Sequence, residues 1–124
     1  MDITGTDFIM LPTQNFEEAE KFYGDVLGLE RSKTWGDMPA REFETGNLTI
    51  AVVETEKLGM GFSPNTNPVA LHVADVAESR AELEAQGVEF AMDTMDSGVC
   101  FMAPFSDPDG NTLMLHSRYA PPEA

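Results

Sequence analysis

The sequence predicts an α+β fold that consists of two tandem βαβββ modules. The first observation is a repeated helical segment: one copy opens at Asn15 and closes at Gly28, and the other opens at Asp75 and closes at Gly87. The second observation is a Gly-Asn pair that precedes the last predicted strand of each module. A unit repeated at an offset of about 60 residues, in a chain of 124, indicates two copies of one supersecondary structure within a single domain.

The first module is expected over residues 1–56. An apolar run at 7–11 predicts its first strand, and Asn15 with Glu18 has the spacing of a capping box, which predicts a helix start. Apolar residues then recur at helical spacing and predict one buried stripe: Phe16, Ala19, Phe22, Tyr23, Val26 and Leu27. The remaining strands of the module are predicted at 29–35, 40–44 and 48–54.

The second module is expected over residues 68–118, after a loop at 57–67 and before a tail at 119–124. Asp75 and Glu78 cap its helix, which ends at Gly87. Asp107 to Asn111 has the composition of a tight turn before the last strand. The strands of this module are predicted at 69–73, 88–91, 99–105 and 112–117. Gly46-Asn47 matches Gly110-Asn111 at an offset of 64, so we expect equivalent hairpin turns there.

Charge and composition exclude several classes of protein. With 22 acidic and 7 basic residues the formal net charge is −15, so nucleic acid is not an expected partner. The acidic side chains form a solvated surface or, alternatively, attract a cationic ligand. No apolar run is long enough to span a membrane, and the N-terminus lacks the features of a signal peptide. The single cysteine, Cys100, cannot form a disulfide within the chain. Together these features predict a cytoplasmic location.

Four segments resemble the vicinal oxygen chelate superfamily, which contains glyoxalases, bleomycin-resistance proteins and extradiol dioxygenases. They occur in the expected order and cover about residues 7–117: Glu20 to Leu29 (EKFYGDVLGL), Leu71 to Val76 (LHVADV), Leu83 to Val88 (LEAQGV) and Asp107 to Asn111 (DPDGN). The resemblance implies curved mixed sheets around a concave cavity. It also implies a homodimer.

The metal enzymes of this family place one ligand on the first and one on the fourth strand of each module. Spacing carries these positions onto Phe8, Ile50, Pro68 and Met114. None of these side chains offers the nitrogen or oxygen that a divalent cation prefers. We therefore expect no metal and no cofactor, and metal-dependent lyase or dioxygenase activity is disfavoured.

Strand alternation extends the inward-facing set beyond those four positions. Met10, Val52 and Ala70 join the set by steps of two, while Trp35 and Met102 are added as adaptable apolar residues. The predicted ligand-binding residues are Phe8, Met10, Trp35, Ile50, Val52, Ala70, His72, Met102, Met114 and His116.

His72 and His116 are the only histidines of the chain, and both fall on the predicted concave face of the second module. One interpretation makes them catalytic acid/base groups or partial metal ligands. The other makes them pocket residues with satisfied hydrogen bonds. Spacing alone does not decide between the two.

The functional prediction is a metal-free binder of a small, largely apolar organic molecule, with a cation favoured by the acidic surface. Bleomycin-resistance-type proteins of the family act in this way, by sequestration. One alternative is a lyase, isomerase or dioxygenase-type enzyme that uses His72 and His116, with or without a divalent metal. Another is a degenerate member that serves as a structural or interaction partner. No nucleic-acid or membrane partner is expected.

Overall fold

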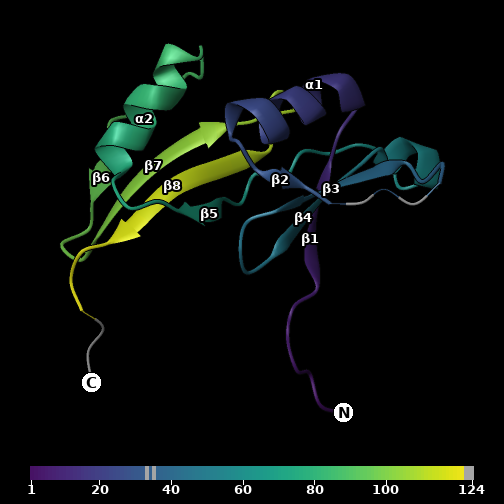
Figure 1. The fold of residues 1–124 in the computed structure, drawn as a ribbon, viewed down its shortest axis with the longest axis horizontal. Coiled ribbons are helices and arrows are strands. Elements are labelled where there is room, and N and C mark those ends of the chain that lie inside the picture. The colour runs from purple at the N-terminus through teal and green to yellow at the C-terminus, as the bar shows by residue number, and fades with distance from the viewer. Residues whose placement is uncertain (33, 35, 122–124) are drawn as a thin grey trace. The chain divides into compact units, whose positions relative to one another are not determined.

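The computed structural model describes residues 1–32, 34 and 36–121. The chain divides into two compact units, Met1–Asn65 and Thr66–Ala124, and each contains one four-stranded mixed sheet and its helix (Figure 1). The prediction of an α+β fold built from two βαβββ repeats is confirmed.

The first unit contains a sheet of order β1-β4-β3-β2. β1 runs parallel to β4, whereas β3 is antiparallel to both of its neighbours. The elements in chain order are β1 (Phe8–Pro12), α1 (Phe16–Glu20), a π-helix (Lys21–Val26), β2 (Glu30–Arg31), β3 (Ala40–Glu44), β4 (Thr49–Val53) and a 3-10 helix (Thr55–Leu58).

The first helix begins as the sequence predicts and then widens. The side chain of Asn15 accepts a hydrogen bond from the Glu18 amide at 3.3 Å and caps α1. From Lys21 onward the helix has π geometry, and the Leu27 amide donates to the Phe22 carbonyl five residues earlier. The sequence pattern gave no indication of this change, because the apolar stripe continues through it.

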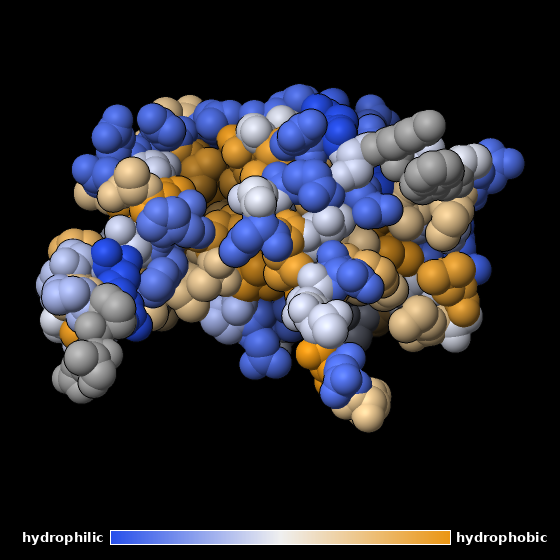
Figure 2. All heavy atoms as spheres, turned by 60° about the horizontal axis from the view of Figure 1, so that its bottom comes forward, coloured by the Kyte–Doolittle hydropathy of each residue, from blue (hydrophilic) through white to orange (hydrophobic). Residues whose placement is uncertain are grey.

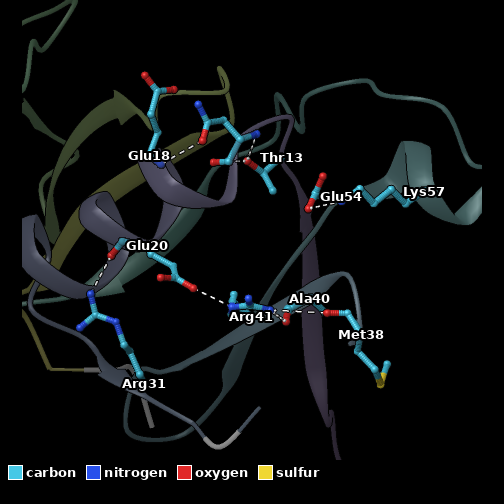
Figure 3. Close-up of polar contacts among 10 residues, drawn as sticks. Thr13, Glu18, Glu20, Arg31, Met38, Ala40, Arg41, Glu54 and Lys57 are labelled. Atoms are coloured by element: carbon cyan, nitrogen blue, oxygen red, sulfur yellow. Dashed lines mark hydrogen bonds and ion pairs between the residues drawn. The ribbon is translucent and has the colours of Figure 1, made fainter. Parts of the chain in front are cut away.

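Arg31 fastens the widened helix to the chain that follows it. Its guanidinium donates to the carbonyl of Glu20 at 3.0 Å (Figure 3). It also pairs with the Asp25 carboxylate at 3.2 Å. The guanidinium lies where a Cβ on Gly24 would be, so only glycine leaves room for it.

The second unit repeats the arrangement, with sheet order β5-β8-β7-β6 and the parallel pair β5–β8. Its elements are β5 (Val69–His72), α2 (Val76–Ala85), β6 (Met95–Asp96), β7 (Cys100–Ser106) and β8 (Thr112–Arg118). The strand predicted at 88–91 is wrong. Phe90 instead packs its ring against Phe105, with Arg80 stacked on it, so the apolar alternation marks a packed connection.

Each helix covers one face of its own sheet. In the first unit Tyr23 stacks on Phe43 of β3, with ring centroids 5.6 Å apart. Arg41, two residues earlier on the same face, bonds the Glu20 carboxylate at 2.6 Å (Figure 3). In the second unit α2 packs against β7 and β8. The helix-facing strand residues are largely buried: Leu11, Phe43, Ile50 and Val52 in the first unit, and Ala103, Phe105, Leu113 and Leu115 in the second.

The two hairpins that precede the last strands differ by one residue. Glu44 pairs with Thr49, which leaves four residues in the first loop, whereas Ser106 pairs with Thr112, which leaves five in the second. Thr49 is therefore the structural equivalent of Thr112, at an offset of 63 rather than 64. Gly46-Asn47 and Gly110-Asn111 do lie in corresponding hairpins, but at different positions within the loops.

A buried carboxylate fixes the longer loop. Asp107 accepts hydrogen bonds from the amides of Asp109 and Asn111, at 2.9 and 2.8 Å, and from the Asn111 side chain at 2.8 Å. Asn111 is fully buried, and Gly110 supplies the positive φ of 89° that the turn requires. This loop sets the register of β8 against β7.

Candidate ligand-binding faces

The face of each sheet opposite its helix, which we term the helix-free face, carries most of the predicted site residues. Side chains alternate along a strand, and residues paired across neighbouring strands share a face. Phe8 pairs with Thr49, and Met10 pairs with Ala51. The helix-free face of the first sheet therefore includes Phe8, Met10, Glu42, Glu44, Thr49 and Ala51.

Ile50 and Val52 are not part of this face, so their placement beside Phe8 and Met10 must be corrected. Both are almost fully buried and lie on the helix-covered side, in register with Ile9 and Leu11. The physical reason is the shorter first hairpin, which shifts β4 by one residue relative to the sequence repeat. A shift of one residue turns every side chain of a strand to the other face.

Hydrophobic residues reach the surface between hydrophilic ones on the side of the molecule drawn in Figure 2. Two large apolar side chains remain accessible on the helix-free face of the first sheet. Phe8 is 50% exposed and Met10 is 40% exposed, whereas their neighbour Ala51 is only 6% exposed. The accessible part of the face is thus the region around Phe8 and Met10. Apolar groups of this size in contact with water favour the binding of another apolar surface.

Two carboxylates lie on the same face, two strands away from these apolar side chains, and the sequence analysis missed both. The hydroxyl groups of Ser32 and Thr49 donate to Glu44 at 2.6 and 2.7 Å, and they hold the pKa of its carboxyl below the ordinary value. The Glu42 carboxylate forms no hydrogen bond or ion pair with the described part of the chain. A usable signal existed: the alternation of Glu42 and Glu44 with the core residue Phe43 places them opposite the helix.

The helix-free face of the second sheet brings the two histidines together. His72 on β5 pairs directly with His116 on β8, and His116 pairs with Met102 on β7. Ala70 and Met114 form the next pair along the same two strands. His72 is exposed, whereas His116, Met102 and Met114 are half-buried. This face therefore groups five of the predicted ligand-binding residues.

Trp35, the remaining predicted site residue, lies outside the described residues. The expectation that the predicted side chains line one concave cavity is wrong for Ile50 and Val52, which lie on the helix-covered side, and it stays a prediction for the others. Among the helices of the described residues, none has the length and apolar character needed to cross a membrane.

The fold and these faces can be compared with known proteins. A family model described as the glyoxalase/bleomycin resistance protein/dioxygenase superfamily matches residues 5–115. The chain belongs to this superfamily. A comparison with curated protein sequences gave no match.

Solved structures of the superfamily share the fold of this member. A superfamily protein from Sphaerobacter thermophilus DSM 20745 is 23% identical, with a TM-score of 0.78 over 92% of this chain and 97% of the other. TnmS3, an antibiotic binding protein from Streptomyces sp. CB03234, is 22% identical, with a TM-score of 0.80 over 95% and 98%. Lactoylglutathione lyase from Agrobacterium tumefaciens is 17% identical, with a TM-score of 0.74 over 93% and 94%. At these identities the likeness concerns the fold alone.

The strand positions at which metal enzymes of the superfamily hold a divalent ion do not suit such an ion in this chain. The strand pairing replaces Ile50 by Ala51 as the counterpart of Met114, so the four positions hold Phe8, Ala51, Pro68 and Met114. Three of these side chains are purely apolar and the fourth is a thioether, whereas hard divalent cations require oxygen or nitrogen ligands. Within the described ranges, no group of three or more His, Cys, Asp or Glu side chains is arranged for a metal.

Proposed function

We propose that this protein binds a small, largely apolar organic cation and sequesters it without chemical change. The observation that carries the proposal is that exposed apolar side chains and carboxylates share the helix-free face of the first sheet. Phe8 and Met10 supply the apolar contact, and Glu42 and Glu44 supply negative charge within the same two strand-to-strand rows. An antibiotic binding protein with the same fold supports a binding role for such a scaffold.

The electrostatics favour a cation over a neutral ligand. Glu44 is held as an anion by two hydroxyl donors, and the carboxylates that form ion pairs among the described residues are all other ones. A ligand cation beside Glu42 would therefore meet charge that no described basic side chain neutralises. Its burial against Phe8 would lower the local dielectric and strengthen the attraction. The net charge of −15 adds a long-range attraction for the same ligands.

The test is a thermal-shift screen with aromatic amines and cationic antibiotics, followed by calorimetry on the best compound. Glu42→Gln should weaken binding by about 1–2 kcal/mol, or roughly 5- to 30-fold, because it removes a charge from the ligand's surroundings. Phe8→Ser should weaken binding of both the cation and its uncharged analogue. Glu82→Gln is the matched control, since Glu82 is an exposed carboxylate on α2 without a hydrogen bond or ion pair to the described residues.

Equal affinity of the wild type and Glu42→Gln for the cation would refute the charge argument. Failure of every compound to bind at Phe8, with the fold intact, would favour an interaction module instead. The proposal also retains a homodimer, which sedimentation of the purified protein tests independently, and a cytoplasmic location, which fractionation of cells tests.

The histidine pair favours a second candidate, an enzyme of lyase, isomerase or dioxygenase type. A lactoylglutathione lyase shares the fold, and His72 and His116 are the groups in this chain best suited to proton transfer. Turnover that disappears in both His72→Asn and His116→Asn, and persists in Phe8→Ser, would establish this function in place of sequestration.

A further inference from the structure

The paired histidines have an arrangement that the proposed organic ligand does not use. β5 and β8 are neighbouring parallel strands, which lie about 4.8 Å apart in a sheet. His72 and His116 are direct partners across them, so both imidazoles project from the same face. Neither ring is hydrogen-bonded to another described residue. The ring nitrogens are therefore available as ligands.

A thioether continues the row on the other side of His116. Met102 on β7 is the direct partner of His116 in the antiparallel pair β7–β8. Opposed residues in such a pair have Cβ atoms roughly 4.5–5.5 Å apart. His72, His116 and Met102 thus form one row across three adjacent strands, with two nitrogen ligands and one sulfur ligand.

We infer that this row binds one soft monovalent cation of the Cu(I) class, through two imidazole nitrogens and the thioether of Met102. Thioether and imidazole ligands suit Cu(I), whereas Mg²⁺ and Ca²⁺ require oxygen ligands. The row contains no carboxylate, and the next pair along the same face, Ala70 and Met114, adds none.

The site is distinct from the one proposed for the organic cation. Phe8 and Glu42, which that ligand requires, belong to the first sheet, and Met102 belongs to the second. Either binding activity can therefore be lost without the other, and the two proposals fail separately.

The test is an anaerobic titration with Cu(I) against a chromophoric Cu(I) chelator. All proteins carry Cys100→Ser, or Cys100→Ala where serine is not tolerated, because a free thiol is itself a strong soft ligand. One ion per chain is expected. Loss of even an outer-shell partner typically costs about 10–100-fold in metal affinity, so His72→Asn and His116→Asn should each lose at least that much. Met102→Leu should lose about tenfold or more.

Ag(I), a diamagnetic probe of similar softness, locates the site by NMR of methionine methyl groups. The Met102 methyl signal should shift on addition of one equivalent of Ag(I), and that of Met60, which is 63% exposed, should not. Met60→Leu is the matched control and should bind Cu(I) as the parent does. Circular dichroism of each variant verifies the fold.

Two results would overturn the inference. One is parent-like Cu(I) affinity in the folded double variant His72→Asn, His116→Asn. The other is parent-like affinity in Met102→Leu. That result would show that the thioether is not a ligand, and the argument for a soft ion would fail with it. Phe8→Ser should leave Cu(I) binding unchanged whether or not it affects the organic cation.

Discussion

Replacement of Asp107 by alanine should destabilise the protein strongly, although the residue lies in a hairpin loop. Its carboxylate accepts two hydrogen bonds from Asn111, one from the amide and one from the side chain, both at 2.8 Å. Asn111 is fully buried, so the alanine variant leaves two donors without this acceptor. Each such loss costs about 1–3 kcal/mol, which gives a total of about 2–6 kcal/mol. The free energy of unfolding of a typical domain is only about 5–15 kcal/mol.

Urea denaturation followed by circular dichroism measures the effect. For an m-value of about 2 kcal/mol/M, the midpoint should fall by about 1–3 M. Asp107→Asn should lie between the wild type and Asp107→Ala, because its amide keeps one acceptor oxygen. The matched control is Asp93→Ala, since Asp93 is exposed and has no hydrogen bond or ion pair with the described residues. Equal midpoints for Asp107→Ala and Asp93→Ala would refute the role assigned to this carboxylate.

Two further predictions concern the first unit. Gly24→Ala should displace the Arg31 guanidinium from the Glu20 carbonyl and lower stability in urea, and this cost should largely vanish in an Arg31→Ala background. Ser32→Ala should raise the pKa of Glu44 toward its ordinary value, as NMR titration of the carboxyl carbon will show. Because the folded pKa is depressed, Glu44 stabilises the fold above its unfolded pKa and less as pH falls through the folded value. The loss of stability on acidification should therefore be smaller in Ser32→Ala than in the wild type. An unchanged dependence of stability on pH would contradict this role of the Ser32 hydroxyl.

The fold was predictable because several local signals agree. The capping residues Asn15 and Asp75 and the glycines that follow each helix fix the helix ends, and the structure confirms the two repeats. The π-helix was not predictable, since the apolar stripe continues through it without a change of spacing. The false strand at 88–91 arose because Phe90 is apolar for packing against Phe105, not for pairing in a sheet.

The candidate site was predictable on one sheet and only in part on the other. In the second sheet, alternation from His116 along β8 gives the face that the structure shows. In the first sheet, the matching Gly-Asn pairs suggested a constant offset, but the loops differ by one residue in length. Because of that difference, the sequence analysis assigned Ile50 instead of Ala51 to the binding face. It also did not recognise that Glu42 and Glu44 lie on this face. Matching turn motifs therefore do not fix how the strands after the turns align between the two repeats. For β3, the buried residue Phe43 is the better guide to which side chains face the helix.

The most direct test of the proposed function is methionine-methyl NMR of the protein with the best cation from the screen. Met10 is the methionine on the helix-free face of the first sheet, and Met60 is an exposed reference elsewhere in the same unit. Saturating ligand should shift the Met10 methyl signal and leave that of Met60 in place. The Met10 shift should be lost in Phe8→Ser at the same ligand concentration. A ligand that binds tightly while the Met10 signal does not move would contradict the assignment of this face as the binding site.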